Sequence, residues 1–165
     1  MTENNFNFSE FHHSIYLRSH LSEVYYYIAS ADGICKWFLG KAEYTDTDGN
    51  TLNAADTARK GDAFLWHWLA KDLSINGHVL EASNDELFSF TFGQAFEVTI
   101  AVKVHEGRTL LTLHQKYADG AAKNDFAHIN CCTCWAFFLT NLKSVLEHGI
   151  DLRETLIDNE SLVNR

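Results

Sequence analysis

The sequence contains no long hydrophobic run: its apolar residues come in short groups, and none approaches the ~20 residues that a helix needs to cross a bilayer. It has no basic cluster either, since its 13 Lys and Arg residues are scattered, and 22 acidic residues bring the net charge to −9. Such a charge repels nucleic-acid phosphates and anionic lipids, so we expect neither nucleic acid nor a membrane as partner. Proline is absent altogether, and no internal repeat or low-complexity segment occurs.

The amino-terminal stretch MTENNFNFSE has no basic region ahead of an apolar run, so no signal peptide is expected and the cytoplasm is the expected compartment. Hydrophobic residues make up 46% of the chain and aromatic residues 13%, which is typical of a folded protein. A length of 165 residues suits one domain, 1–165, able to bury roughly 70% of the surface that its unfolded chain exposes. We expect its core to span about 11–153, with flexible termini at 1–10 and 154–165.

The beginning of the chain predicts one strand and two short helices. The stretch FHHSIYL, residues 11–17, alternates between inward and outward side chains, which is typical of a strand. Apolar residues then recur at helical spacing in SHLSEVYYYIAS, with Ser19 or His20 as the N-cap. The pattern breaks at 31–33, and the amphipathic ICKWF that follows predicts a second short helix.

A polar stretch with a turn at Asp48-Gly49 leads to residue 62, where the period becomes two. Strands are expected in the segments 62–68, 73–82, 86–93, 96–105 and 108–117, and in all of these except 73–82 mainly aromatic or aliphatic side chains share one face. Their close spacing and short links predict an antiparallel meander.

The last element has helical period. From about Asn124 to His148 apolar residues form one stripe, with Asn124 or Asp125 as the cap and Gly149 after the last turn. The order of elements predicts an α+β domain, in which a curved antiparallel sheet of six or seven strands surrounds the long carboxy-terminal helix.

This order, with certain residues in place, resembles the START-like (SRPBCC) superfamily with its helix-grip fold. It is most similar to the bacterial relatives of the carboxy-terminal domain of the heat-shock-protein-90 ATPase activator. The matching stretches are SIYLRSHLSEVYYYIASADGICKWF, KGDAFLWHW and CWAFFLTNLKSVLEHGIDLR, the last being the most specific. The chain departs from the family at Leu21, where a proline is frequent, and at Cys134, where a glycine commonly precedes the tryptophan.

The resemblance implies a fold and a kind of site rather than a reaction. Members of the superfamily hold apolar or amphipathic molecules between the sheet and the long helix, and a few are cyclases or hydratases. Three functions are therefore considered: non-enzymatic binding of a small apolar ligand, interaction with a heat-shock-protein-90-type chaperone in the stress response, and catalysis with His128 as base. We expect no cofactor, no metal, and a monomer or weak homodimer.

The stretch HINCCTCW, residues 128–135, favours packing over metal binding or redox chemistry. On a helix His128, Cys131 and Cys132 lie within reach of one ion. However, successive helical residues differ by about 100°, so Cys132 and Cys134 fall on opposite flanks of the stripe that contains Cys131. The motif also begins well inside the helix, away from the free N–H groups that lower a thiol pKa.

Polar residues on apolar faces and rigid aromatics fit either a ligand pocket or a packed core. His128 points with Trp135 toward the presumed cavity, and Gln115 lies on an otherwise apolar strand face. No Ser/His/Asp or paired-carboxylate spacing supports catalysis, so we name no catalytic residue. The residues that we predict to contact a ligand are Trp37, Phe64, Trp66, Trp68, Phe90, Phe96, Gln115, His128, Cys131 and Trp135.

Overall fold

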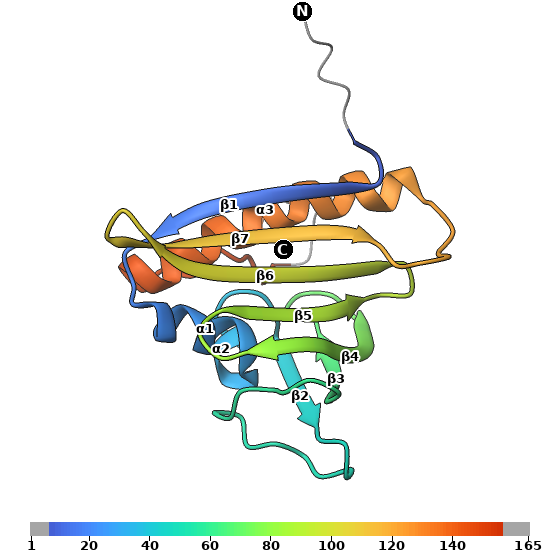
Figure 1. The fold of residues 1–165 in the computed structure, drawn as a ribbon, viewed down its shortest axis with the longest axis horizontal. Coiled ribbons are helices and arrows are strands. Elements are labelled where there is room, and N and C mark those ends of the chain that lie inside the picture. The colour runs from blue at the N-terminus through green and yellow to red at the C-terminus, as the bar shows by residue number, and fades with distance from the viewer. Residues whose placement is uncertain (1–6, 157–165) are drawn as a thin grey trace, which may run out of the picture.

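The computed structural model describes residues 7–156, and its elements follow the predicted order (Figure 1). A seven-stranded antiparallel sheet, in the order β1-β7-β6-β5-β4-β3-β2, curves around the long helix α3, which confirms the α+β class and the helix-grip arrangement. The elements are β1 (Glu10–Leu17), α1 (Leu21–Ala29), α2 (Ala31–Cys35), β2 (Lys41–Thr45), β3 (Ala63–His67), β4 (Ser74–Ser83), β5 (Leu87–Phe92), β6 (Phe96–His105), β7 (Arg108–Tyr117) and α3 (Asp125–His148).

The second short helix begins earlier than the sequence pattern predicts. The chain leaves helical geometry at Ser30, and α2 starts with the next residue instead of after a break at 31–33. The reason is local: the Ser30 hydroxyl accepts a hydrogen bond from the Gly33 N–H at 3.0 Å and so caps the new helix. At the preceding helix, the His20 side chain is the N-cap, as one of the two expected residues.

Gly33 allows α2 to approach α1 closely. A Cβ at this position would overlap the carbonyl oxygen of Tyr26 and the Cα of Tyr27. Both are backbone atoms, so no side-chain rotation can relieve the overlap. We expect Gly33→Ala to lower the free energy of unfolding by about 1–3 kcal/mol, the usual cost of overpacking a core, measured by urea denaturation. Unchanged stability would show that the two helices separate without cost.

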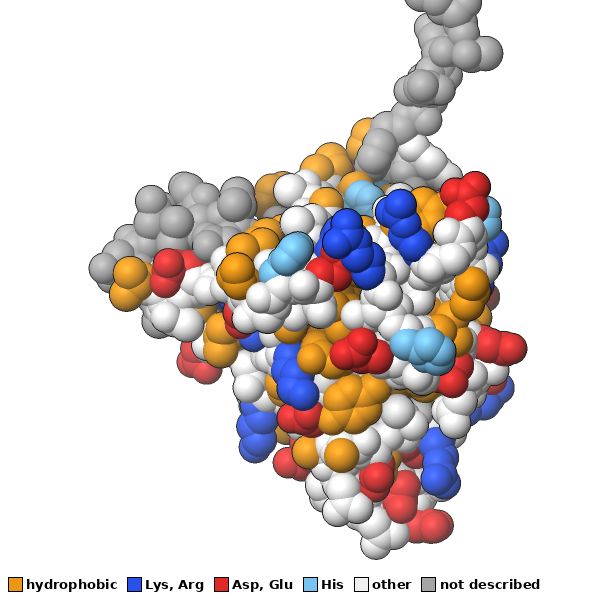
Figure 2. Space-filling model, turned by 90° about the vertical axis from the view of Figure 1, so that its left-hand side faces the viewer, with side chains coloured by type: hydrophobic (Ala, Val, Ile, Leu, Met, Phe, Trp, Pro, Cys, Tyr) orange, Lys and Arg blue, Asp and Glu red, His pale blue; other side chains and the backbone are white. Residues whose placement is uncertain are grey.

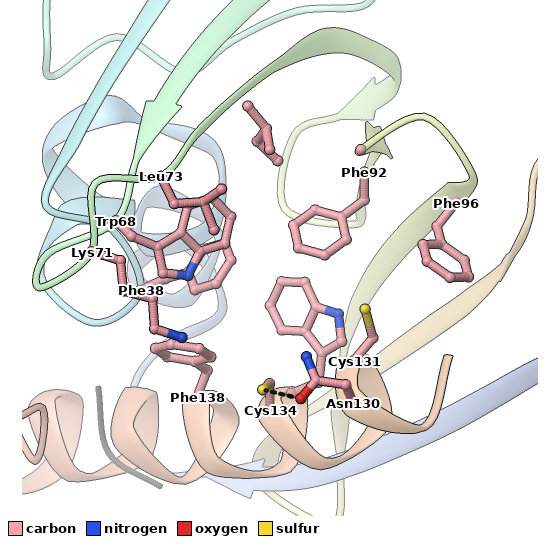
Figure 3. Close-up of a pocket in the computed structure, with 13 residues that line it drawn as sticks. Phe38, Trp68, Lys71, Leu73, Phe92, Phe96, Asn130, Cys131, Cys134 and Phe138 are labelled. Carbon is pink, nitrogen blue, oxygen red and sulfur yellow. Dashed lines mark hydrogen bonds between the residues drawn. The ribbon is translucent and has the colours of Figure 1, made fainter. Parts of the chain in front are cut away.

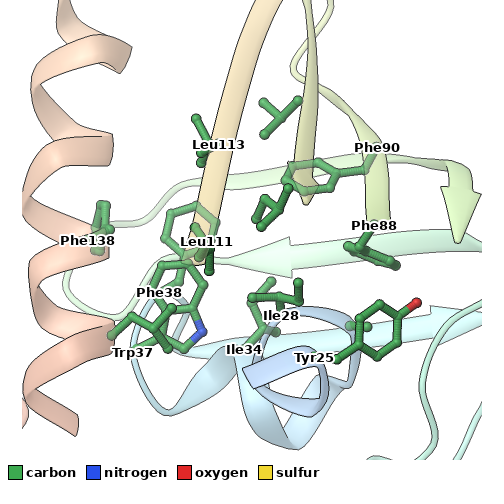
Figure 4. Packing of buried hydrophobic residues seen from close by; sticks show 14 of the residues in the cluster. Tyr25, Ile28, Ile34, Trp37, Phe38, Phe88, Phe90, Leu111, Leu113 and Phe138 are labelled. Atoms are coloured by element: carbon green, nitrogen blue, oxygen red, sulfur yellow. The ribbon is translucent and has the colours of Figure 1, made fainter. Parts of the chain in front are cut away.

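The core lies between the concave face of the sheet, the α1–α2 pair and α3 (Figure 4). Its centre is aromatic: the rings of Phe64 and Trp66 stack with centroids 4.1 Å apart, and Phe90 meets Trp66 edge-on at 5.0 Å. The fully buried Trp37 donates its indole N–H to the carbonyl of Tyr27 at 2.9 Å. These rings fill the middle of the fold with one another.

A carboxy-terminal clamp, formed by Asn141, Asp151 and Arg153, ties the segment after α3 to the rest of the fold. The Asn141 amide donates to the Asp151 carboxylate at 3.0 Å. Arg153 pairs with the same carboxylate at 2.7 Å and donates to the carbonyls of Leu39 and Cys35 at 2.9 and 3.0 Å. Asp151 and Arg153, near the end of the family-like stretch CWAFFLTNLKSVLEHGIDLR, thus hold the chain after α3 against the end of α2 and the α2–β2 connection.

Within residues 7–156, no helix is long and apolar enough to span a membrane. On the face shown in Figure 2, basic side chains are dispersed among acidic, histidine and hydrophobic ones. Of the termini predicted to be flexible, 1–6 and 157–165 lie outside the described residues, whereas Glu10 already belongs to β1.

Candidate ligand-binding pocket

A pocket of about 250 Å³ lies between the amino-terminal half of α3 and the neighbouring ends of β3, β4, β5 and β6 (Figure 3). Its walls are mostly aromatic and aliphatic, with two thiols on the helix side. The lining residues are Phe38, Trp68, Lys71, Leu73, Ile75, Phe92, Gly93, Phe96, Asn130, Cys131, Cys134, Trp135 and Phe138. The pocket therefore lies at the edge of the aromatic core and not at its centre.

The size of the side chains on α3 explains the position of the pocket. Toward its carboxyl end the helix turns Phe138 and Leu142 toward the sheet, and both are almost fully buried. One to two turns earlier it presents the smaller Cys131 and Cys134, which leave space between helix and strand ends. Trp135 forms a fixed wall of this space, because its indole N–H donates to Gln115 on β7 at 2.9 Å.

Few polar groups reach the pocket. Among the described lining residues, Lys71 is the only one with a full charge, and it is a cation in a chain of net charge −9. The Asn130 amide oxygen accepts a weak hydrogen bond from the Cys134 thiol at 3.9 Å (Figure 3). Burial raises the pKa of the Cys131 and Cys134 thiols, so both stay protonated near pH 7 and behave as apolar lining.

Trp68, Phe96, Cys131 and Trp135 are the residues of the predicted contact set that line this pocket. The remaining aromatics of that set lie in the packed centre of the fold: Trp37, Phe64, Trp66 and Phe90. Period-two alternation places Trp66 and Trp68 on one face, but β3 ends at His67, and only the ring beyond its end reaches the pocket.

The two polar residues of the contact set, Gln115 and His128, are fully buried beside the pocket and not in its lining. Gln115 lies behind Trp135 and accepts its indole hydrogen bond. The His128 ring stacks on Tyr117 with centroids 5.6 Å apart and meets Phe11 edge-on at 5.2 Å. In this position His128 is part of an aromatic cluster that joins the first turns of α3 to β1 and β7.

Residues 19–147 match the family model described as "Activator of Hsp90 ATPase homolog 1-like protein". The chain belongs to this family. The resemblance seen in the sequence is thereby confirmed over most of the chain. No curated protein matches this chain.

Solved structures share the fold of this family member at low sequence identity. A protein from Staphylococcus saprophyticus is 17% identical with a TM-score of 0.68, over 87% of this chain and 96% of that one. The Aha1 dimer from Colwellia psychrerythraea is 18% identical with a TM-score of 0.65, over 85% of this chain and 97% of that one. DynU16, from the dynemicin biosynthetic locus, is 14% identical with a TM-score of 0.67, over 89% of this chain and 50% of that one. At these identities the likeness concerns the fold alone.

Several pocket residues of this family member were absent from the predicted contact set. Phe92 ends β5, Phe38 follows α2 and Phe138 lies on α3, each inside an apolar pattern that also describes core residues. Position along the strand is the sequence signal that could have identified such residues, because residues at strand ends line the pocket and mid-strand residues fill the core. Lys71 lies in the loop before β4, where no periodic pattern exists to mark it.

The cysteine-rich stretch shows no geometry for thiol chemistry among the described residues. The carbonyl of Cys132 can only accept a hydrogen bond, so the Nε2 of His13, 2.8 Å away, carries a proton and donates to it. That nitrogen therefore cannot act as a base toward the Cys132 thiol, 3.6 Å away. Burial also raises the pKa of this thiol, which disfavours the reactive thiolate.

Proposed function

We propose that the protein binds a small apolar or amphipathic ligand, without catalysing a reaction, in the pocket beneath α3. The observation that carries the proposal is an aromatic-lined space of about 250 Å³ with a cation and an amide among its lining residues. Ligand sites generally combine mostly apolar walls with a few polar groups that fix orientation. Family membership agrees with this function, because the superfamily uses the space between sheet and helix in this way.

The size and polarity of the pocket define the ligand class. An apolar cavity of ~150 Å³ accepts a benzene ring, and typical ligand pockets begin near ~300 Å³, so a single ring or a short alkyl chain fits. Lys71 would attract an acidic head group, and Asn130 adds an amide to the lining. We therefore expect short-chain or aromatic carboxylates to bind more tightly than neutral molecules of equal size.

Octanoate is a suitable probe for this proposal, and octanol is its neutral counterpart of similar size, which we expect to bind less tightly. With octanoate at about ten times its Kd, alkylation of Cys131 and Cys134 by iodoacetamide should slow about tenfold, because both thiols line the pocket. Cys35 and Cys132 do not line it and serve as internal controls in the same mass-spectrometric measurement. Equal protection of all four cysteines, or of none, would contradict binding in this pocket.

Filling the pocket should abolish binding while leaving the fold intact. We expect Cys134→Trp to weaken octanoate binding at least about a hundredfold by calorimetry, because the indole would occupy the ligand's space. The matched control is Thr133→Trp, which places the same side chain on the exposed side of α3 and should bind normally. Tight binding by the Cys134 variant would place the ligand elsewhere.

An interaction with a heat-shock-protein-90-type chaperone is the second candidate function, and the family match favours it. Such an interaction would use an exterior surface instead of the pocket. A pull-down with the chaperone, combined with its ATPase rate, tests this alternative, and an unchanged rate would count against it. Catalysis with His128 as base draws no support from the geometry, because that ring is fully buried and does not line the pocket.

A further inference from the structure

The outer face of the sheet carries a cluster of histidines and a carboxylate, on the side opposite the pocket. His12 on β1 and His114 on β7 are direct cross-strand partners, and their rings stack in parallel with centroids 4.1 Å apart. Glu10 precedes His12 by two residues and so shares its face. Its carboxylate lies 2.8 Å from the Nε2 of His114.

We propose that Glu10, His12 and His114 form a binding site for a divalent transition-metal ion of the Zn²⁺ type. Each residue offers one ligand atom, and the three atoms lie within 4.8 Å of one another. Two imidazole nitrogens and one carboxylate oxygen are a donor set that suits zinc and its neighbours in the first transition series. Tetrahedral zinc with bonds of about 2.0–2.1 Å needs its donor atoms roughly 3.3 Å apart. It also needs imidazole planes that converge on the ion, so the parallel rings of His12 and His114 must rotate about their side-chain torsions to bind it.

The pairing of β1 with β7 fixes the positions of these three residues, and only weak interactions involve their ligand atoms. The two histidines sit on strands whose pairing runs from Glu10–Lys116 to Leu17–Thr109, so their Cα positions are fixed by the ladder. The contact between Glu10 and His114 involves side chains that are 43% and 28% exposed, and such a pair contributes little by itself. An entering cation therefore displaces only a weak interaction, and solvent gives it access.

The charges around the cluster also favour a cation. Lys116 is the cross-strand partner of Glu10, but its ammonium pairs with Glu97 at 3.2 Å. Thr99, the cross-strand partner of His114, and the adjacent pair Ser14 and Thr112 on the same face are neutral. Among the described residues the Glu10 carboxylate thus has no lysine or arginine partner, on a chain whose net charge is −9.

Calorimetric titration of the reduced, full-length protein with Zn²⁺ tests the site. His12→Gln and His114→Gln should each weaken the affinity at least about tenfold, since each removes a direct ligand. Glu10→Gln should weaken it less, because an amide oxygen remains a weaker donor. His78→Gln is the matched control: it removes an exposed histidine of β4, outside the cluster, and should leave the affinity unchanged.

Titration with Co²⁺ distinguishes this site from the cysteine-rich stretch on α3. Binding at Glu10, His12 and His114 gives only visible d–d bands, whereas thiolate ligands add an intense near-ultraviolet charge-transfer band. Absence of Zn²⁺ binding, a thiolate band, or an affinity for Zn²⁺ that His12→Gln and His114→Gln leave unchanged would overturn the proposal. Equal weakening by His78→Gln would also overturn it, because the ion would then bind dispersed histidines non-specifically.

Discussion

Trp66→Ala is expected to lower the free energy of unfolding by about 3–5 kcal/mol, the usual cost of removing a large aromatic ring from a core. Trp66 has no exposed surface, stacks on Phe64 and meets Phe90 edge-on. Neighbours held in β-strands cannot collapse into the space that the indole leaves, so the cost should lie toward the upper end. Chemical denaturation followed by circular dichroism measures it.

Trp68→Ala is the comparison that separates core from pocket. This ring is only partly buried and lines the pocket, so its removal should cost less than half as much stability. It should weaken octanoate binding, because one wall of the pocket is lost. Similar stability losses in the two variants would mean that Trp68 belongs to the core and that the pocket is closed in solution.

Arg153→Met is expected to lower the free energy of unfolding by about 3 kcal/mol, although the residue lies beyond the last helix. Its side chain is only 6% exposed, so removing the guanidinium leaves the carbonyls of Cys35 and Leu39 without their donor. It also leaves the Asp151 carboxylate without its ion pair. Arg59→Met, at an exposed position, is the control and should change stability by no more than about 0.5 kcal/mol.

The clamp also predicts how acid affects stability. Burial by itself raises the pKa of Asp151, but hydrogen bonds from Arg153 and Asn141 and the Arg153 charge outweigh it and hold the pKa below its ordinary value. A carboxyl group with a lowered pKa stabilises the fold above its unfolded pKa of about 3.9 and loses that contribution as pH falls through the folded value. Arg153→Met should therefore destabilise the protein strongly at pH 7 and less below pH 4. An equal loss at both pH values would exclude an electrostatic role.

Periodicity is sufficient to predict most of the fold. It does not predict where each element starts or which neighbours a side chain meets at a given position along the element. The alternation in β5 and β6 and the apolar stripe of α3 predicted these elements and their inward faces, since both patterns follow from backbone geometry. The start of α2 was missed, because the Ser30 cap acts through one hydrogen bond and leaves no periodic trace.

The pocket illustrates the same limit. Helical angle correctly directed His128 inward, but direction around a helix does not reveal which neighbours lie at that height. The first turns of α3 pass over Phe11 and Tyr117, so the histidine meets a packed cluster, while Cys131 one turn later meets open space. Likewise, the cross-strand contact of His12 with His114 depends on β1 pairing with β7, a register that local alternation does not specify.

The pairing of β1 with β7 also determines when β1 can join the sheet as the chain is synthesised. Strands β2 to β7 each pair with a neighbour in the chain, so they can assemble as they leave the ribosome. The residues of β1, in contrast, find their partners only across the interval from Glu10 to Lys116. Closing so long a loop costs entropy that local hairpins avoid. The first strand to be synthesised is therefore among the last to be incorporated, together with the helix that packs against it.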